Sequence, residues 1–490
     1  MVYYVDPFKG DDSRAGTSAD QAWRTLGRVS REVFKAGDQV LLVRDGVWAE
    51  GVKLRGRGKP EKPIALGAYG EGPRPRISGG EAHAITAEEP ISAWRVSGLE
   101  LTSTNDKNPT HKIQGGTCGV FFHQEELCEG LVVEGCVIHD TSGPGIYLSA
   151  TGEEKAVFAN VVIEHCEIFN ASCGIQFAAH PLRGTDFFPS FRIAHVVAHD
   201  IGGDGIVPFN GRDGVVEYCT AYRTGLGCDP ADHSPVAIWY AVAKRCAIQF
   251  CHAYDNRTGG RGADGGGFDL DGGCVDCVLQ YNYSHDNEGA GYLICSWDPV
   301  QYPCTGCICR YNVSVNDGLA NDYASIHFWQ NMDCLIHNNT CITRGALGMK
   351  FATNGGDAKG NLIANNIFVC DTPEDVPIVR SEFDIGGNRF RNNCYYHLRG
   401  EARFALNGDD VRGLAEFAKV VKGEGEINAD PLLADAAAGD YHLRPGSPCR
   451  GAGMRLPGMG GRDYYGATLA EEGPVDIGCA AVSREPMMST

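Results

Sequence analysis

Three acidic residues lie close together in one glycine-rich segment of the sequence. The segment reads Gly262-Ala263-Asp264-Gly265-Gly266-Gly267-Phe268-Asp269-Leu270-Asp271. Asp269 and Asp271 are two positions apart, so on a β-strand their side chains face the same side. Carboxylates are unfavourable in strands and repel one another, so the pattern indicates a functional gain. Paired carboxylates can transfer protons and attack a sugar carbon, and carboxylates are also calcium ligands.

A repeat in the chain predicts the fold that positions these carboxylates. A short strand motif recurs roughly every 30 residues, and its last residues are Cys136, Cys166, Val196, Cys219, Cys251, Asn282, Asn312, Asn338, Asn365 and Asn392. The repeats alternate with period two and are rich in Val, Ile, Tyr, Gly and Asn, which favours strands over helices. One unit cannot bury its apolar face alone and must stack on its neighbours. The sequence therefore predicts an all-β, single-stranded, right-handed parallel β-helix of about ten or more rungs.

A second strand in each unit sorts its side chains into two columns. The inward column is apolar and contains Ile146, Ile175, Ile206, Ile238, Phe268, Tyr292, Ile326 and Met349. The outward column contains Tyr147, Gln176, Val207, Trp239, Asp269, Leu293, His327 and Lys350. Because stacked strands lie about 4.8 Å apart, Trp239 is expected one rung from Asp269, with His327 and Trp329 two rungs away.

These columns predict a groove with acids at its centre and sugar-binding residues around it. The predicted catalytic residues are Asp269, Asp271, Asp264 and Asp298, the last in Ser296-Trp297-Asp298-Pro299. The predicted substrate contacts are Gln176, Asp204, Trp239, His327, Trp329 and Lys350. Structural alternatives remain open: surface charges for the aspartates, a hydrogen-bonding histidine, tryptophans packed under a loop and a solvated lysine.

The two ends of the chain differ from the repeats. Residues 1–80 are expected to form an N-terminal cap and the first rungs, with an amphipathic helix near Ala22 to Phe34. Residues 81–427 are expected to form the β-helix, and residues 428–490 an irregular C-terminal cover on the same continuous domain. Solenoids need such caps because a terminal repeat exposes an apolar face.

Composition limits the partners and the compartment. The net charge is −19, which disfavours nucleic acid and anionic membrane surfaces as partners. The first residues lack the pattern of a signal peptide, which predicts a cytoplasmic protein unless a leader has been removed. The 21 cysteines are then expected to be reduced and to fill the core. Zinc at Cys274-Val275-Asp276-Cys277 and Cys304-Thr305-Gly306-Cys307 is the weaker alternative.

Both ends of the chain resemble the bacterial pectate-lyase-like β-helix superfamily. The resemblance rests on Tyr3-Tyr4-Val5-Asp6, Gly16-Thr17-Ser18, Gly37-Asp38, Asp45-Gly46-Val47-Trp48, Asp430-Pro431 and Arg444-Pro445-Gly446-Ser447-Pro448. The segment from Gly267 to Asp271 is similar to the catalytic rungs of β-helix glycoside hydrolases, including a family of intracellular β-xylosidases. That resemblance implies a nucleophile at Asp271. The chain departs from the family at the next rung, where Leu293, Ile294 and Cys295 stand in place of a glutamate.

Three functions follow as expectations. The first is a glycoside hydrolase that acts on an oligosaccharide or polysaccharide with paired aspartates and needs no cofactor. The second is a polysaccharide lyase or uronate epimerase, in which Asp264, Asp269 and Asp271 bind calcium and Lys350 or His327 removes the C5 proton. The third is a noncatalytic glycan-binding β-helix. The sequence leaves the sugar, the linkage and the oligomeric state open.

Overall fold

The structure of the chain is a computed structural model. It describes residues 1–87, 89–103, 116–153, 155–180, 182, 184–227, 234–259, 264–353 and 358–481. The chain divides into two compact units, the first made of residues 1–246 and 257–263 and the second of residues 247–256 and 264–490. No helix in the described ranges is long and apolar enough to cross a membrane.

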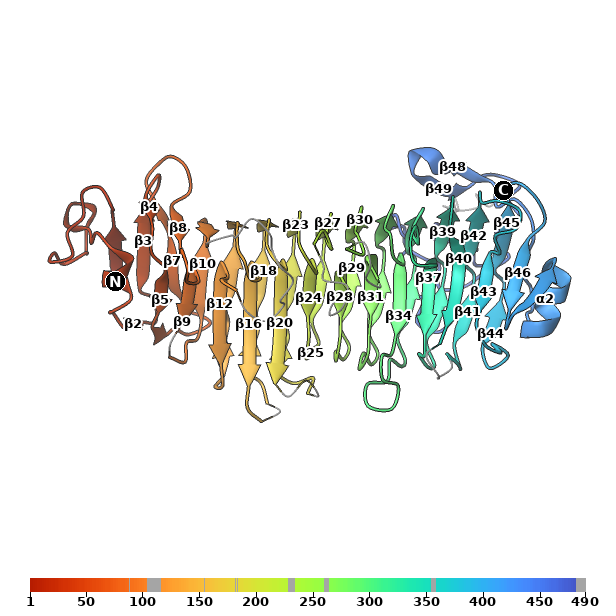
Figure 1. Cartoon of the computed structure of the whole chain (residues 1–490), viewed down its shortest axis with the longest axis horizontal. Coiled ribbons are helices and arrows are strands. Elements are labelled where there is room, and N and C mark those ends of the chain that lie inside the picture. The colour runs from red at the N-terminus through yellow and green to blue at the C-terminus, as the bar shows by residue number, and fades with distance from the viewer. Residues whose placement is uncertain are drawn as a thin grey trace, which may run out of the picture. The chain divides into compact units, whose positions relative to one another are not determined.

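The first unit is a coil of three parallel sheets (Figure 1). Its first sheet has the order β1 (Val2–Val5), β3 (Gln39–Val43), β7 (Ile64–Tyr69), β10 (Trp94–Ser97), β14 (Val132–Glu134), β18 (Val162–Glu164), β22 (Arg192–Ala194) and β26 (Val215–Glu217). The second sheet contains β4 (Val47–Trp48), β8 (Arg76–Ser78), β11 (Glu100–Thr102), β15 (Val137–His139), β19 (Glu167–Phe169), β23 (Val197–His199) and β27 (Thr220–Tyr222). The third contains β5 (Val52–Leu54), β9 (Ile85–Ala87), β12 (Val120–Gln124), β16 (Ile146–Thr151), β20 (Ile175–His180), β24 (Ile206–Pro208) and β28 (Val236–Tyr240). Short pairs join β2 (Phe34–Lys35) with β6 (Gly56–Arg57), β13 (Cys128–Glu129) with β17 (Phe158–Ala159), and β21 (Phe188–Pro189) with β25 (Gly211–Arg212).

The second unit repeats this plan. Its first sheet contains β29 (Ala247–Gln249), β32 (Val278–Gln280), β35 (Ile308–Arg310), β38 (Leu335–His337), β41 (Leu362–Ala364) and β44 (Arg389–Arg391). The second sheet contains β30 (His252–Tyr254), β33 (Tyr283–His285), β36 (Val313–Val315), β39 (Thr340–Thr343), β42 (Ile367–Cys370) and β45 (Cys394–His397). The third contains β31 (Gly266–Leu270), β34 (Tyr292–Cys295), β37 (Ala324–Trp329), β40 (Leu347–Ala352), β43 (Val379–Ser381), β46 (Arg403–Leu406) and the antiparallel β47 (Asp409–Arg412).

The predicted right-handed parallel β-helix is confirmed, and so is its register. Ile146 pairs with Ile175 and Ile175 with Ile206 in the first unit, while Phe268 pairs with Tyr292 and Tyr292 with Ile326 in the second. All of these side chains are fully buried. Successive rungs therefore stack apolar side chains on one another, which is the main source of stability in a solenoid.

A ladder of asparagines supports the turns of the second unit. It includes Asn282 and Asn312, which end two of the repeat motifs, and then runs through Asn339 and Asn366, one residue after the motif ends at Asn338 and Asn365. All four are fully buried, and the Nδ2 group of each donates to the Oδ1 atom of the next asparagine at 2.9–3.1 Å. Stacked amides satisfy buried polar groups that would otherwise be costly.

The ends of the chain are less regular than the coils. Near the N-terminus a 3-10 helix spans Ala19–Gln21 and α1 spans only Leu26–Val29, although the sequence predicted a helix from Ala22 to Phe34. Both ends of that stretch take part in β-pairing instead. Trp23 forms a parallel β-bridge with Val5, and Phe34 belongs to β2.

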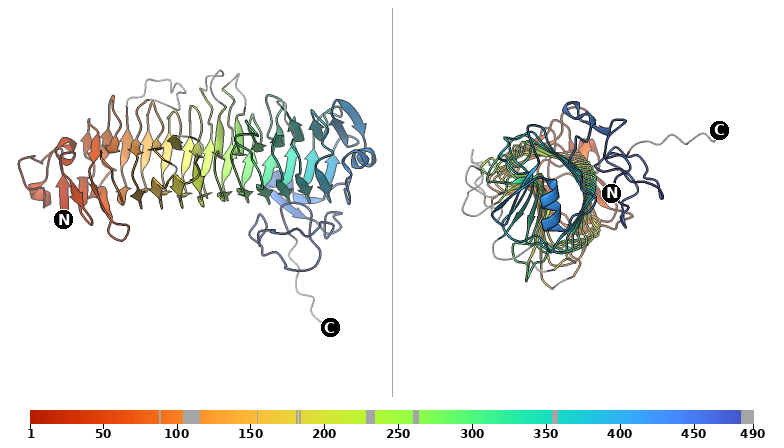
Figure 2. Two further views of the ribbon diagram at one scale, coloured as in Figure 1. Left: turned by 90° about the horizontal axis from the view of Figure 1, so that it is seen from below. Right: turned by 90° about the vertical axis from the view of Figure 1, so that its right-hand side faces the viewer.

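The second unit carries a helical cap and an outer cover. The helix α2 (Leu414–Val421) lies across the end of its coil, where Phe417 stacks on Phe404 at 4.0 Å (Figure 2). The hairpin of β48 (Leu433–Asp435) and β49 (Asp440–Leu443), with a 3-10 helix at Ala436–Ala438, packs on the outside of the coil through Tyr441, Leu443 and Ile477. The terminal repeats are thereby shielded from water.

Candidate active site

The strand β31 of the second unit carries the predicted acids. Phe268 and Leu270 are fully buried in the core, so alternation directs Asp269 to the outer face of the third sheet. The parallel neighbours of Asp269 along this face are Leu293 on β34, His327 on β37 and Lys350 on β40 (Figure 1). The sequence thus predicted this part of the outer column and its order.

The outer column is more buried than an exposed sheet face would be. Asp269 is 1% exposed and His327 is 2% exposed. Leu293, Cys295 and Tyr323 form a small buried cluster on this face, with the half-buried Trp329 packed against it. The carboxylates therefore lie in an environment of low polarity, which strengthens electrostatic interactions.

Asp271 follows β31 and is half-buried. The Gly272 N–H donates a hydrogen bond to its Oδ1 atom at 2.7 Å. Burial raises the pKa of Asp271 from 3.8 to about 6, against the hydrogen bonds from the Cys295 thiol and the Gly272 N–H, which lower it. A carboxyl group with such a pKa can hold a proton in weakly acidic solution and donate it.

Asp264 occupies a different environment, at a turn before β31. Its backbone has a φ of +57°, which is uncommon for a residue with a side chain. The Tyr323 hydroxyl donates to Asp264 Oδ1 at 2.6 Å, and the Asp264 N–H donates to the same hydroxyl oxygen at 3.0 Å. A phenol that donates to a carboxylate stabilises its negative charge and fixes its orientation.

Cys295 lies close enough to the three acids for their charges to act on its thiol. Its side chain is 8% exposed. Burial raises the pKa of this thiol well above its usual range, and the negative charges of Asp271, Asp269 and Asp264 raise it further. We name Asp264, Asp269, Asp271, Cys295 and Tyr323 the carboxylate cluster. Sequence reasoning missed Cys295 and Tyr323, because neither belongs to a recognisable motif.

An exposed indole lies beside this cluster. Trp297 is 42% exposed, and its ring lies so close to Gly272 that a Cβ atom there would be 2.7 Å from it. The Trp297 ring also packs on Tyr302, with ring centroids 5.2 Å apart. An exposed aromatic ring next to a carboxyl group is a suitable surface for the apolar face of a sugar. The sequence pattern assigned this tryptophan no role.

Asp298, predicted as a supplementary acid, holds a turn. Its Oδ1 atom accepts the N–H groups of Val300 and Gln301, each at 3.0 Å. This pattern is typical of an aspartate that stabilises a tight turn.

Lys350, weighed as a base or a solvated charge, is a buried and paired cation. It is 6% exposed, and its Nζ atom lies 2.9 Å from Asp322 Oδ2 and 3.0 Å from Glu382 Oε1. An ammonium group paired with two carboxylates is a poor base.

The remaining predicted contacts, Gln176, Asp204 and Trp239, belong to the first unit. Asp204 and Trp239 bind one another, since the indole Nε1–H donates to Asp204 Oδ1 at 2.9 Å. The same oxygen accepts the Val236 N–H at 2.9 Å. Trp239 is 8% exposed and packs with Val207 in a buried cluster, and Gln176 is buried as well. Trp239 is thus a packed and hydrogen-bonded side chain of the first unit.

The group of metal-ligating side chains that the described structure brings together is made of cysteines and not of the predicted carboxylates. Within the described ranges, Cys304, Cys307 and Cys334 form the single group of three metal-ligating side chains whose ligand atoms all lie within 4.8 Å of one another. Calcium needs six to eight oxygen ligands. The three thiols are buried, and each donates to a backbone carbonyl oxygen at 3.3–3.5 Å, as cysteines that fill a core do.

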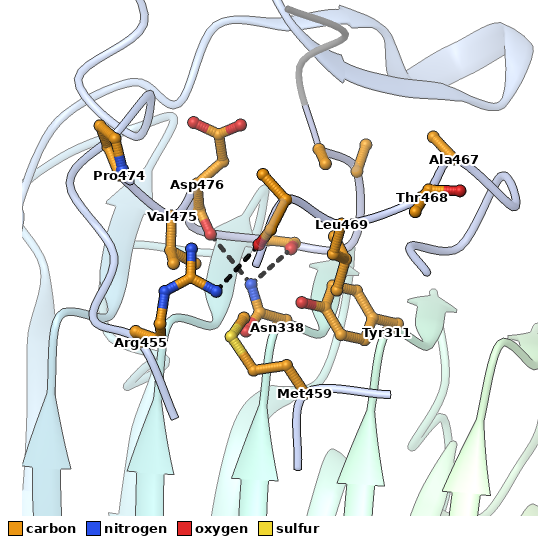
Figure 3. Close-up of a pocket in the computed structure, with 14 residues that line it drawn as sticks. Tyr311, Asn338, Arg455, Met459, Ala467, Thr468, Leu469, Pro474, Val475 and Asp476 are labelled. Carbon is orange, nitrogen blue, oxygen red and sulfur yellow. Dashed lines mark hydrogen bonds between the residues drawn. The ribbon is translucent and has the colours of Figure 1, made fainter. Parts of the chain in front are cut away.

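A separate hollow of about 240 Å³ lies under the C-terminal cover (Figure 3). Its lining includes Tyr311, Met459 and Leu469, and its Asn338 Nδ2 donates to the Asp476 carbonyl at 2.9 Å. Its one carboxylate, Asp476, is directed away from Tyr311 and accepts the Gly451 N–H at 2.7 Å. The described lining thus lacks the pair of carboxylates that acid–base chemistry on a sugar requires.

Comparison with known proteins finds similar sequences and similar folds. No protein-family model matches the chain. The chain is 21% identical over 565 residues to a lacto-N-biosidase from Bifidobacterium longum subsp. longum, a match that covers 93% of the chain and 34% of that protein. The chain therefore spans about a third of the length of this curated relative.

Solved structures share the fold. A GH136 lacto-N-biosidase from Eubacterium ramulus has a TM-score of 0.58 at 22% identity and covers 83% of this chain and 68% of its own. The complex of XylC with xylose has a TM-score of 0.56 at 14% identity and covers 99% of both chains. A PL6 family alginate lyase, AlyGC, has a TM-score of 0.55 at 15% identity and covers 100% of this chain and 60% of its own. The chain thus shares a right-handed β-helix fold with these proteins, and this fold is compatible with more than one reaction.

Proposed function

We propose that the chain is a glycoside hydrolase and that its reactive carboxyl groups are Asp271 and Asp264. The observation that carries the proposal is the contrast between their environments. Burial favours the protonated form of Asp271, whereas the Tyr323 hydroxyl stabilises the charge of Asp264. Two carboxyl groups with contrasting environments on one segment are the usual arrangement for an acid and its partner in glycoside hydrolysis.

The reaction follows from these roles. The Asp271 carboxyl group donates its proton to the glycosidic oxygen while the bond from that oxygen to the anomeric carbon breaks. The Asp264 carboxylate either attacks the anomeric carbon or takes a proton from the water that does so. One water molecule is consumed, and the two products are a shortened glycan and a free sugar.

This assignment differs from the role that the sequence resemblance implies for Asp271. The resemblance implies a nucleophile, which has to be ionised. The raised pKa of Asp271 supports the role of the general acid instead. Asp271 would then do the work of the glutamate that this chain lacks on the next rung. Asp264 then takes the second role.

The proposed substrate is an oligosaccharide with a neutral sugar at the cleaved bond, and a terminal lacto-N-bioside is the first candidate. The named activity of the Bifidobacterium longum relative and the shared fold of a second lacto-N-biosidase support this choice. The likeness to XylC with xylose makes a xyloside the second candidate. The exposed Trp297 beside Asp271 suits either sugar, because both have an apolar ring face.

The test is a panel of p-nitrophenyl glycosides that includes the β-lacto-N-bioside and the β-xyloside, with and without EDTA. We expect release of p-nitrophenol that EDTA does not change. Uronate polymers, including alginate, should give no unsaturated product that absorbs in the ultraviolet. An unsaturated, EDTA-sensitive product from alginate with no hydrolysis of any glycoside would refute the proposal in favour of a lyase.

A further inference from the structure

His327 lies beside the carboxylate cluster, and neither of its ring nitrogens is hydrogen-bonded to a described residue. The residue is on β37 and is 2% exposed. Within the described part of the chain, neither Nδ1 nor Nε2 has a hydrogen-bond partner. Buried polar atoms are almost always paired, because each unpaired one costs free energy in the folded state. Two such atoms on one ring therefore indicate a partner that arrives from outside.

The described neighbours of the ring offer it no hydrogen-bonding group that is free. The Tyr323 and Trp329 rings lie 4.7 Å and 6.1 Å from the imidazole, centroid to centroid, and the parallel neighbour on β34 is Leu293. The neighbour on β40 is Lys350, whose ammonium group is held by Asp322 and Glu382. The imidazole is thus surrounded by ring faces, an aliphatic side chain and a cation that is already paired.

The charge state of the ring fixes what it can bind. Burial, with the positive charge of Lys350, lowers the pKa of His327 to about 3. The ring is therefore neutral at any ordinary working pH, with one nitrogen as a donor and the other as an acceptor. A sugar hydroxyl matches either nitrogen, because it both donates and accepts.

The ring also lies next to the reactive groups. Tyr323 contacts His327 through its ring and holds Asp264 through its hydroxyl at 2.6 Å. The same phenol thus connects the imidazole with the proposed nucleophile or base. A sugar bound at Asp264 would therefore lie beside Tyr323, whose ring contacts the imidazole of His327.

We propose that His327 is a substrate-binding residue whose two ring nitrogens exchange hydrogen bonds with hydroxyl groups of an uncharged sugar at the cleaved bond. The proposal rests on the proposed function and deepens it, because it names the class of sugar. A uronate is negatively charged and would need an unpaired cation beside it. Lys350, the cation next to His327, is already paired with Asp322 and Glu382.

The test compares His327→Phe and His327→Gln with His337→Phe. His337 is a matched control because it is a fully buried histidine on β38, whose Nδ1 atom lies 3.0 Å from Asn338 Oδ1. Kinetics use the aryl glycoside that the wild-type protein hydrolyses. The midpoint temperature of thermal unfolding, called the midpoint below, is measured with and without xylose and lacto-N-biose.

We expect His327→Phe to lower kcat/KM by about tenfold to a hundredfold and to leave the midpoint of the free protein unchanged or raised. His327→Gln, which keeps a donor and an acceptor, should recover part of the loss. His337→Phe should lower the midpoint and leave kcat/KM unchanged. A stabilised protein that has lost turnover is the signature of a residue kept for its ligand.

The outcomes separate this proposal from the proposed function. If the wild-type protein hydrolyses none of the glycosides, the proposed function fails. The binding role is still supported in that case if a sugar raises the thermal midpoint of the wild-type protein but not that of His327→Phe. A midpoint lowered in His327→Phe as in the control, with unchanged kcat/KM, overturns the proposal. The binding role is also overturned if no sugar raises the wild-type midpoint, or if one raises that of His327→Phe equally.

Discussion

Replacing Asp271 by asparagine should stabilise the protein at neutral pH while it removes activity. Burial raises the pKa of this carboxyl group from 3.8 to about 6, so the folded state prefers the protonated form. Below pH 3.8 the group is protonated in both the folded and the unfolded state. As the pH rises from there through about 6, the unfolded state ionises first and the free energy of unfolding falls. The full loss is about 3 kcal/mol.

Asparagine does not titrate, so the free energy of unfolding of Asp271→Asn does not fall in this way as the pH rises. We expect the free energy of unfolding of Asp271→Asn, relative to the wild-type protein, to increase by about 2 kcal/mol between about pH 4.5 and about pH 7.5. Urea unfolding followed by circular dichroism at both pH values measures this change. A relative stability that does not depend on pH would refute the assignment of the raised pKa, and with it the role of Asp271 as the acid.

Asp317 provides the matched control. It is fully buried, and burial raises its pKa to about 6 as well, but its oxygens accept hydrogen bonds from Ser314 and Asn287 inside the coil. Asparagine already occupies the preceding positions of this ladder, at Asn256 and Asn287. Asp317→Asn should therefore show a similar pH-dependent gain in stability with unchanged turnover, which separates the effect of a buried charge from the effect on catalysis.

Three further predictions concern the same site. The kcat/KM of the wild-type protein should fall as the pH rises through about 6, because the Asp271 proton is then lost; a profile that stays flat from about pH 5 to about pH 8 would contradict this. Tyr323→Phe removes the hydroxyl that donates to Asp264 and should lower kcat by about tenfold to a hundredfold, whereas an unchanged kcat would show that the hydrogen bond has no part in the reaction. Trp297→Ala should raise KM by about threefold to tenfold with little change in kcat, whereas Trp297→Phe should keep most of the affinity. Equal KM values for the wild-type protein and both variants would exclude stacking of the sugar on Trp297.

The fold could be predicted because it depends on local alternation and a fixed repeat. Two-residue alternation placed Phe268 inside and Asp269 outside, and the repeat spacing placed Asp269, Leu293 and His327 on successive rungs. The asparagine ladder follows the repeat motif at Asn282 and Asn312 and departs from it by one residue after that, because two neighbouring asparagines there satisfy the same pattern. Asn338 has a positive φ and binds the C-terminal cover, while Asn339 takes the ladder position.

The site was harder to predict because its decisive contacts come from turns. Tyr323 reaches Asp264 across 59 residues of sequence, and no periodic pattern marks that contact. Trp297 belongs to a turn after β34, so strand alternation gave it no position. The burial of the outer face was also missed, because alternation gives the direction of a side chain but not what covers it. That burial is the cause of the raised pKa of Asp271 and of the neutral state of His327.

The most direct test of the proposed hydrolase measures kcat for four single substitutions on one p-nitrophenyl glycoside. We predict that Asp264→Asn and Asp271→Asn each lower kcat by about a thousandfold. We also predict that Asp298→Asn and Asp317→Asn leave kcat within about twofold of the wild-type value, because these carboxylates hold a turn and an internal ladder. Wild-type turnover in both Asp264→Asn and Asp271→Asn would contradict the proposed mechanism.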